Sequence, residues 1–381
     1  WGTEVGRWEV FSDPDREVVT PGDSIEFTSI YRSPIQWVAG QKDLLIGALE
    51  MEYVASADGI FQPADIGVFM HSTHGSVNVQ PVGMGETILF PAENGRRVRA
   101  MSYRQDDEGW VAPDLTFWHP DLCRSGIKRM VRMRNPHQMC VVVLKNGKLA
   151  ILHQDTYVGI TGWSQVNLNA VVKDAAVVAD ANGVDILLLV VERNIAGEKR
   201  LYVEAIGDWI DGKTWQYVQS HLATTTVDGT FVDGLEHLEG QQVQVIGDGE
   251  FLGVFTVRNG RVELINDLGL SYNKQSVIVG MQIRSTLRTL PLVTSSPASK
   301  KRYTKVSVRG LLSTRVEING ERPKDRTPST PQDKSEPLVI REDFEVANLG
   351  WDVSQPITVR ESVPYRAEIL GIFGTVKGNS V

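Results

Sequence analysis

Tight Asn-Gly turns between short strand-like runs are the feature that most constrains this 381-residue chain. The dipeptide occurs between charged residues in segments 93–96, 145–148 and 258–261, and segment 318–320 holds another copy. Asn and Gly adopt positive φ at little cost, so this pair favours two-residue β-hairpin turns. Helix-period patterns are nearly absent. The sequence therefore predicts an all-β fold.

The runs between these turns have two kinds of strand pattern. Segments 24–28 and 303–308 alternate with period two, which is typical of a strand with one wet face. Segments 44–46, 140–144 and 186–191 are continuously apolar and closely bounded by polar or Gly residues, which predicts buried strands.

One short segment has helix signals. Asp114 is a suitable N-cap for residues 114–119. Pro120 limits the expected helix to one or two turns.

A weak internal repeat organises the first half of the chain. An apolar strand, a turn and a second strand recur in segments 43–57, 86–104, 138–154 and 185–206. The starts lie 43, 52 and 47 residues apart, close to the spacing of β-propeller blades. We favour a propeller-like array of antiparallel β units in which each hairpin forms half of a four-stranded blade. An irregular β-sandwich array is the alternative.

The sequence pattern changes after about residue 229. The length of the chain suggests two or three domains. We predict a propeller-like region over residues 1–229, a small inserted β domain over 230–293 and a C-terminal β region over 294–381. Residues 294–302 read as a linker. Residues 321–337 carry four prolines among polar neighbours and read as a long loop, followed by closing strands at 338–340 and 369–373.

Charge, hydropathy and cysteine content argue against several classes of protein. Lys and Arg number 39 against 47 Asp and Glu, giving a net charge of −8, which argues against broad capture of nucleic acid. No apolar run approaches the ~18–20 residues of a membrane-spanning helix, so no stable membrane insertion is expected. Cys123 and Cys140 are too few for a disulfide framework or a four-thiolate metal site. We expect two buried thiols in a protein that folds in a reducing cytoplasm.

Candidate catalytic and metal-binding residues are sparse. His71 and His74 form the one close histidine pair, but on a strand they would point to opposite faces. Asp106, Asp107 and Glu108 read as a solvated loop, because a calcium loop needs alternating oxygen ligands. We therefore predict no metal, no cofactor and no catalytic residue.

Two further groups have a functional and a structural interpretation. A glycan-hydrolysing site needs two carboxylates ~5–10 Å apart, and the acids in or beside predicted strands are Asp43, Glu50, Glu52, Asp185 and Glu192. The structural interpretation of these acids as strand-edge or turn charges is favoured. The basic cluster suggests either phosphate contact or a solvated sheet edge that discourages strand addition, and the edge is favoured. Its members are Lys300, Lys301, Arg302, Lys305 and Arg309.

Several segments, taken in order, resemble phage tail nozzle proteins, also called tail tubular protein B, of short-tailed phages. One of them carries Gly75-Ser76 and Gln80-Pro81, as in the family's Gly-Ser-x-x-x-Gln-Pro stretch. The segments are 37–47, 52–54, 72–82, 86–90, 95–99, 110–116, 232–240, 290–292, 300–302 and 350–352. The resemblance covers essentially the whole chain, although no single motif is chemically unique.

The resemblance implies a virion structural protein, made in the host cytoplasm and located in the tail. It would form a homo-oligomeric, hexameric nozzle or tube below the portal and its tail adaptor, the head-to-tail connector. Genomic DNA would pass through the lumen, and tail fibres or tailspikes would attach at the side. Family members carry further β units before the segment that matches Trp1, and the chain lacks an initial Met, so we expect it to be the C-terminal portion of a larger subunit.

Three functions from different classes follow from these observations. The favoured one is the structural nozzle, with no enzymatic activity. A propeller enzyme or glycan-binding tail protein that acts on glycans is the alternative, and a monomeric propeller adhesion module is the third. The loops at 106–113, from Asp106 to Pro113, and at 321–337, from Glu321 to Pro337, are the expected contacts with adaptor, fibres or neighbouring subunits. Most of the nine tryptophans are expected to anchor blades or subunit contacts.

Overall fold

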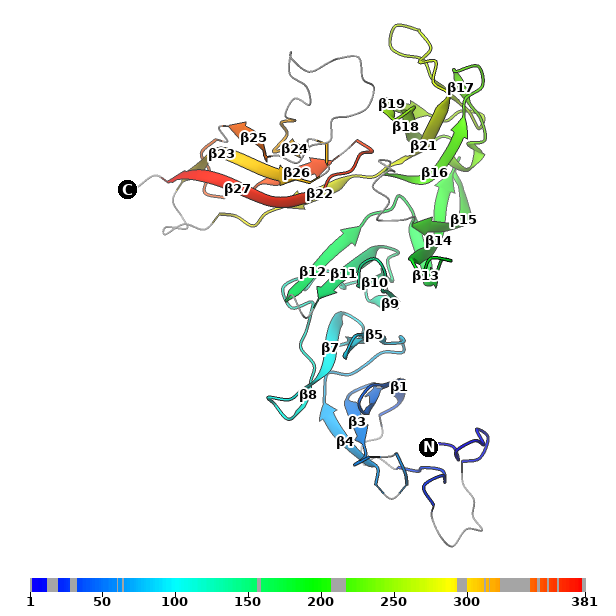
Figure 1. Cartoon of the computed structure of the whole chain (residues 1–381), viewed down its shortest axis with the longest axis vertical. Coiled ribbons are helices and arrows are strands. Elements are labelled where there is room, and N and C mark those ends of the chain that lie inside the picture. Colours follow the sequence, from blue (N-terminus) through cyan, green and yellow to red (C-terminus); the bar gives the residue numbers. More distant parts are fainter. Residues whose placement is uncertain are drawn as a thin grey trace. The chain divides into compact units, whose positions relative to one another are not determined.

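The chain is all-β, as the sequence predicts (Figure 1). The computed structural model describes residues 2–11, 20–27, 33–59, 61–63, 65–155, 159–206, 217–292, 300–311, 313–314, 316–322, 343–347, 350–354, 356–361 and 363–378. Within these ranges the only helical element is a short 3-10 turn, Glu236–Leu238. None of the described helical structure is long or apolar enough to cross a membrane.

The chain divides into two compact units. The first comprises Trp1–Arg193 and Arg200–Ile210, and the second comprises Asn194–Lys199 and Asp211–Val381.

The first unit is a series of antiparallel meanders. The first sheet is β1 (Ile35–Gly40), β2 (Leu44–Ala48), β3 (Glu52–Ser56) and β4 (Gly67–Ser72). The second is β5 (Val82–Met84), β6 (Thr87–Ala92), β7 (Arg97–Arg104) and β8 (Gly109–Val111). The third is β9 (Ile127–Met133), β10 (Met139–Leu144), β11 (Leu149–Asp155) and β12 (Ile160–Val166). The fourth is β13 (Val171–Ala179), β14 (Asp185–Ile195) and β15 (Glu198–Ile206).

These sheets confirm the propeller-like array of antiparallel β units. The predicted hairpins are β2–β3, β6–β7, β10–β11 and β14–β15. In the first three sheets each hairpin is the middle pair of a four-stranded blade, with one further strand on either side. The sequence pattern marked the middle strands because they carry the longest apolar runs.

Consecutive sheets pack face to face, and β10 shows how. All six of its residues are buried. Its even-numbered residues Cys140 and Val142 pack with Leu89 of the second sheet, whereas Val141 and Val143 pack with Leu187 of the fourth. Because successive side chains on a strand point to opposite faces, a continuously apolar strand is the one that can lie between two sheets.

Two expected elements are absent. Residues 24–27 form no strand; Ile25 makes one isolated bridge to Gly2, and Thr28 lies outside the described residues. Residues 114–119 form turns rather than a helix. The Asp114 carboxylate accepts the expected cap bond from the Thr116 backbone N–H (2.7 Å) and a second bond from the Thr116 hydroxyl (2.6 Å), but the chain before Pro120 forms only turns.

Two of these four Asn-Gly pairs form the predicted two-residue turn. Asn259-Gly260 and Asn319-Gly320 have positive φ at both residues, and their flanking residues are bridged. Asn94-Gly95 also has positive φ at both residues, but it lies in a four-residue connection between the paired residues Ala92 and Arg97. In the turn between β10 and β11, positive φ is found at Gly147 but not at Asn146. The Asn146 carboxamide oxygen instead accepts a hydrogen bond from the Lys148 backbone N–H, 3.1 Å away.

The second unit begins with a four-stranded sheet in the order β16-β21-β18-β19. Its strands are β16 (Val218–Thr225), β18 (Gln242–Gly247), β19 (Glu250–Thr256) and β21 (Ser276–Gln282), and a small pair, β17 (Phe231–Val232) and β20 (Val262–Glu263), accompanies it. One apolar core, which includes Val243, Val245 and Val279, serves these elements. Because β16 pairs with β21, this sheet recruits residues upstream of 230.

Two three-stranded sheets complete the second unit, in the orders β22-β26-β24 and β25-β23-β27. Their strands are β22 (Ser285–Arg288), β23 (Lys301–Gly310), β24 (Glu317–Ile318), β25 (Asp343–Ala347), β26 (Thr358–Glu361) and β27 (Ile369–Gly378). The predicted alternating strand at 303–308 and the closing strand at 369–373 are present. The expected linker at 294–299, most of the Pro-rich loop (323–337) and the strand at 338–340 lie outside the described residues.

Candidate functional site

The five acids of the glycan-hydrolase hypothesis contact different structural partners. Asp43 accepts a hydrogen bond from the Trp110 indole N–H (2.9 Å), and Glu192 pairs with the Lys173 ammonium (3.0 Å). The Glu50 side chain is exposed.

Glu52 is the most deeply buried of these acids. Its side chain is fully buried on β3, and its carboxylate accepts hydrogen bonds from the hydroxyls of Ser72 (2.7 Å) and Ser76 (3.0 Å) and from the His74 backbone N–H (3.2 Å). A buried charge is tolerated when such donors replace water. This carboxylate therefore holds the chain that follows β4 against the first sheet.

The histidine pair lies close to this carboxylate. His71 is on β4 and His74 follows the strand. Burial lowers the pKa of both imidazoles, and Glu52 partly opposes the effect. Among the described residues, no group of three or more His, Cys, Asp or Glu side chains could hold a metal ion. In the described parts of the chain, His71 and His74 thus lack the further ligands that a zinc site requires.

Asp185 stands at the start of β14 and joins the fourth sheet to the end of the third. Its carboxylate accepts hydrogen bonds from the backbone N–H groups of Arg134 (2.5 Å) and Asn135 (3.4 Å), and the Arg134 guanidinium lies 3.6 Å away. The Arg134 backbone N–H is the largest cause that lowers the pKa of Asp185. A carboxylate stabilised in this way is a poor proton donor near neutral pH.

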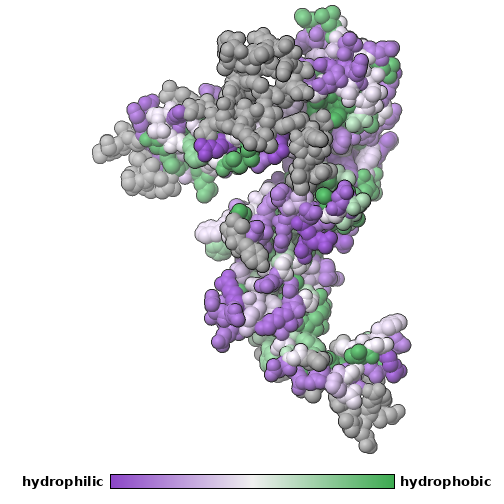
Figure 2. Space-filling model, in the orientation of Figure 1, coloured by the Kyte–Doolittle hydropathy of each residue, from purple (hydrophilic) through white to green (hydrophobic). Residues whose placement is uncertain are grey.

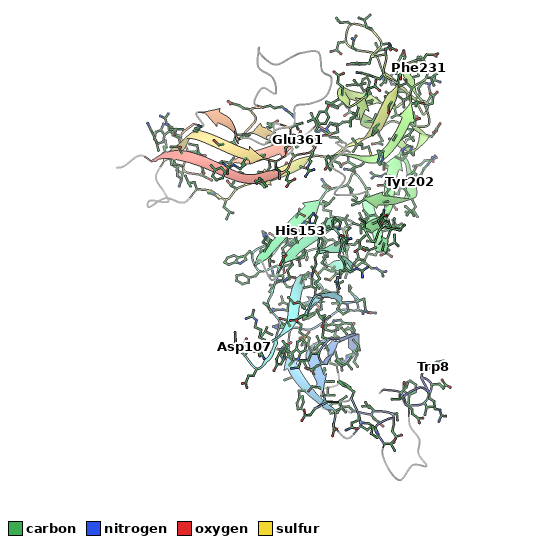
Figure 3. All side chains as sticks on the ribbon, viewed as in Figure 1. Trp8, Asp107, His153, Tyr202, Phe231 and Glu361 are labelled. Atoms are coloured by element: carbon green, nitrogen blue, oxygen red, sulfur yellow. The ribbon has the colours of Figure 1, made fainter. Side chains whose placement is uncertain are left out.

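The acidic run 106–108 lies at a hairpin end. Arg104 pairs with Gly109, and residues 105–108 form the exposed turn between β7 and β8. Figure 3 shows the labelled Asp107 at the end of this hairpin. The prediction of an irregular loop over 106–113 is wrong for residues 109–111, which form β8, because the buried Trp110 anchors them to Asp43.

The basic cluster on β23 is not a sheet edge. The strand lies between β25 and β27, so the edge interpretation is wrong. Lys301 is buried, and the Arg302 guanidinium lies 5.1 Å from the centre of the Trp351 ring. Lys305 and Arg309 are exposed on β23, and their partners in register on β25 are Ala347 and Asp343.

One buried ion pair was not predicted from the sequence. Arg193 is almost completely buried, and its guanidinium binds the Glu204 carboxylate through Nε (2.6 Å) and Nη2 (2.7 Å) and the Asn169 carbonyl through Nη1 (3.2 Å). A signal was present, because Arg193 shares strand parity with Leu187, Leu189 and Val191. A charged residue on an apolar face predicts a buried partner.

Three of the six described tryptophans join neighbouring blades, as predicted for most of them, whereas Trp8 (82%) and Trp118 (84%) are exposed. The Trp37 ring on β1 lies 5.2 Å from the ring of Phe90 on β6, and Trp110 on β8 bonds Asp43. Trp163 on β12 donates its indole N–H to the Leu115 carbonyl at 2.8 Å. Trp1, Trp209 and Trp215 lie outside the described residues.

Both cysteines are buried in one core, as expected. Cys123 and Cys140 belong to the cluster between the second and third sheets, and burial raises the pKa of each thiol to about 12. Thiols with such pKa values are inert as nucleophiles, since the thiolate is the reactive form.

The polar residues of the first unit therefore join strands and sheets to one another.

Comparison with known proteins identifies no family for the chain. No family model and no curated protein matches it. Among solved structures, it is similar to the WD40 domain of SCAP from fission yeast (12% identity, 53% of this chain and 47% of that one, TM-score 0.29). It is also similar to the periplasmic gluconolactonase PpgL of Pseudomonas aeruginosa (13% identity, 58% and 70%, TM-score 0.27) and to a bifunctional GH43-CE protein of Bacteroides eggerthii (8%, 90% and 54%, TM-score 0.24). The chain thus spans about half the length of the first and third structures, and similarities of this degree carry no inference about function.

Proposed function

We propose that the chain is a structural subunit of a phage tail, part of a nozzle ring or tube through which DNA leaves the virion. The ordered sequence resemblance carries this proposal. Its segments fall on repeated structural elements: residues 37–47 span most of the β1–β2 hairpin, and segments 86–90 and 95–99 lie on the β6–β7 hairpin. A shared order of blade hairpins is expected of proteins that share an architecture.

The chemistry of the acids is compatible with a mechanical role. The buried carboxylates of Glu52 and Asp185 accept hydrogen bonds from the backbone and from serine hydroxyls. We therefore propose no catalytic activity. If intact virions or the purified chain cleave a glycan, and an Asp or Glu substitution abolishes turnover without unfolding the chain, the enzyme alternative replaces this proposal.

The charge of the chain suits a conduit. A net charge of −8 favours repulsion of phosphate over its capture, so DNA would slide past the subunits rather than bind them. The exposed turn at residues 105–108 is a contact candidate for the tail adaptor, fibres or a neighbouring subunit.

Negative-stain electron microscopy of the purified chain tests the proposal. We expect ring- or tube-shaped particles with six-fold symmetry under virion-like salt and pH. Single-subunit particles that persist at all concentrations would contradict it. A gel-shift assay with duplex DNA at low salt adds an independent readout, because a conduit subunit leaves the duplex unshifted.

A further inference from the structure

Asn-Gly pairs carry a chemistry that their role in turns does not use. The backbone nitrogen of the glycine can attack the side-chain carbonyl carbon of the asparagine, because glycine has no Cβ to hinder the approach. Asparagine is for this reason one of the thermolabile residues. The chain holds five such pairs: Asn94-Gly95, Asn146-Gly147, Asn182-Gly183, Asn259-Gly260 and Asn319-Gly320. The attacking atom is the glycine nitrogen, so the state of the glycine N–H separates one pair from another.

In three pairs the glycine N–H donates to the backbone carbonyl three residues earlier. These bonds join Gly95 to Ala92 (3.0 Å), Gly147 to Leu144 (2.9 Å) and Gly183 to Asp180 (3.1 Å). A nitrogen whose proton is held in this way must first lose the bond before it can turn toward the side chain. The fold therefore protects these three pairs.

The two-residue turns at 258–261 and 318–321 form a matched pair. Each has positive φ at both central residues and a bridge between its flanking residues. The flanking backbone N–H···O bonds measure 2.9 and 3.1 Å in the first turn and 2.8 and 3.0 Å in the second. Opening either turn breaks equivalent flanking bonds, so the two turns differ in what holds the glycine between them.

Gly260 is held by a charged acceptor. The Glu239 carboxylate accepts hydrogen bonds from the backbone N–H groups of Asn259 (3.0 Å) and Gly260 (2.6 Å). These bonds keep the turn closed. The carboxylate also opposes loss of the Gly260 proton, because a second negative charge would form beside it.

Gly320 has no such acceptor. The residue is exposed, and within the described part of the chain no hydrogen bond from its N–H is present. The neighbouring carboxamide is held instead: the Asn319 side-chain oxygen accepts a hydrogen bond from the Thr358 backbone N–H at 2.7 Å. A donor at this oxygen stabilises the negative charge that develops there when the carbonyl carbon is attacked. Asn319-Gly320 therefore combines an unbonded nucleophile with a polarised carbonyl.

Access of water does not separate the two turns. Asn259 and Asn319 are both exposed, and Figure 2 shows mainly hydrophilic surface over the four-stranded sheet of the second unit. The hydrogen bond of the glycine N–H remains as the difference between them.

We propose that Asn319 is the deamidation site of this chain and converts to aspartate and isoaspartate faster than the other four Asn-Gly asparagines. Hydroxide removes the Gly320 amide proton, and the nitrogen forms a bond to the Asn319 Cγ. The carboxamide nitrogen takes a proton from water and leaves as ammonia, which gives a five-membered succinimide. Water then opens the ring at either carbonyl. The net change consumes one water and releases one ammonia, and it does not depend on the proposed function.

The two products differ in their effect on the sheet. Aspartate keeps an oxygen acceptor for the Thr358 N–H. Isoaspartate adds one carbon to the main chain at the turn, and so it disturbs the register of β24 with β26, where Ile318 pairs with Val359. Deamidation at this turn is therefore a slow, irreversible change in a folded sheet.

Peptide mapping by mass spectrometry tests the site. The purified chain is kept folded at mildly alkaline pH, and each Asn-Gly peptide is followed over time. We expect deamidation at Asn319 to be at least about tenfold faster than at Asn259, the factor that one hydrogen bond to a charged group corresponds to. In urea the five rates should converge, because every pair then has the same glycine and no fold to protect it.

Removing the acceptor at the protected turn tests the cause. Glu239→Ala should speed deamidation at Asn259 about tenfold and leave the rate at Asn319 unchanged. The matched control is Glu236→Ala, because the Glu236 side chain also lies beside Gly260 but accepts no hydrogen bond from its N–H. Circular dichroism confirms that both variants are folded, and the wild-type comparison of Asn319 with Asn259 needs no variant.

Three results would overturn the inference. The first is a folded wild type in which Asn319 deamidates no faster than the other four asparagines. The second is a Glu239→Ala variant whose rate at Asn259 matches that of Glu236→Ala. The third is a ranking that persists unchanged in urea, which would assign the difference to local sequence instead of the fold.

Discussion

Buried carboxylates stabilise this chain by accepting hydrogen bonds that span long sequence distances. Asp185 shows the effect most directly, because its side chain is 2% exposed and its main partner, the Arg134 backbone N–H, lies 51 residues earlier in the chain. Solvent screening is weak at such a site, so each charge-assisted hydrogen bond contributes more to stability than a similar bond at the surface does.

Replacing Asp185 by Asn should lower the free energy of unfolding by about 1–3 kcal/mol, because the charged acceptor is lost. The pKa of Asp185 is lowered by folding. Its stabilisation is therefore complete above the pKa of an unfolded Asp, ~3.9, and is lost as pH falls through the lower folded pKa. In urea unfolding, the difference in free energy of unfolding between wild type and Asp185→Asn should be constant near neutral pH and should shrink in acid. A difference that does not depend on pH would contradict the electrostatic account.

The histidines beside Glu52 predict a second pH dependence. Burial lowers the pKa of His71 and His74 below ~6.5, so the unfolded chain binds more protons than the folded chain in that window. Stability should be complete above pH ~6.5 and should fall as pH decreases toward the folded pKa values. His71→Gln/His74→Gln should reduce this loss in thermal melts between pH 7.5 and 5. His153, whose pKa burial also lowers, should leave a residual slope in the variant.

At the scale of elements, sequence predicted the middle hairpins of the blades but not their outer strands. β10 reads as a strand because all six of its residues are apolar, whereas β9 carries Lys128, Arg129 and Arg132 and β12 is largely exposed. Such outer strands form because an apolar neighbour offers unpaired backbone groups, which is a tertiary effect. The place of β23 was mispredicted for the same reason, since its partners β25 and β27 come from distant sequence.

Candidate site residues were predicted by type but not by partner. The sequence named Asp43, Glu52 and Asp185, and it could not show that Trp110, Ser76 and Arg134 meet them across 67, 24 and 51 residues. No local pattern encodes contacts of that range.

The bond between Trp110 and Asp43 predicts how strongly one blade holds the next. Trp110→Phe keeps most of the ring but removes the indole N–H donor to a carboxylate, which should cost about 1.5–3 kcal/mol of unfolding free energy. Trp118→Phe is the matched control, because Trp118 is 84% exposed. Chemical denaturation of both variants checks the difference, and equal stabilities would show that ring packing alone joins the blades.

At the scale of the whole molecule, the two units have separate cores. Leu89 belongs to a core of the first unit and Leu235 to a core of the second, and both are fully buried. Units with separate cores need not unfold in one step, so a single midpoint would misdescribe the chain.

Differential scanning calorimetry should therefore resolve more than one transition. Leu89→Ala should lower the free energy of unfolding of the first unit by about 2–5 kcal/mol, as expected for a buried Leu→Ala change. The transition midpoint of the first unit should therefore fall, and the other transitions should keep their midpoints. Leu235→Ala should do the reverse. A single transition that both substitutions shift equally would show that the units unfold together.

The complete burial of β10 has a consequence for the newly made chain. Residues 139–144 are six consecutive apolar residues without charge or Pro, the composition that stacks into cross-β aggregates when exposed. The folded protein hides this segment only after the sheets on both sides of it have formed. Arg134 before it and Lys145 and Lys148 after it supply the flanking charges that keep such segments apart. A strand that joins two sheets of the array is thus also an aggregation hazard during synthesis, and its charged flanks protect the chain until the neighbouring sheets are in place.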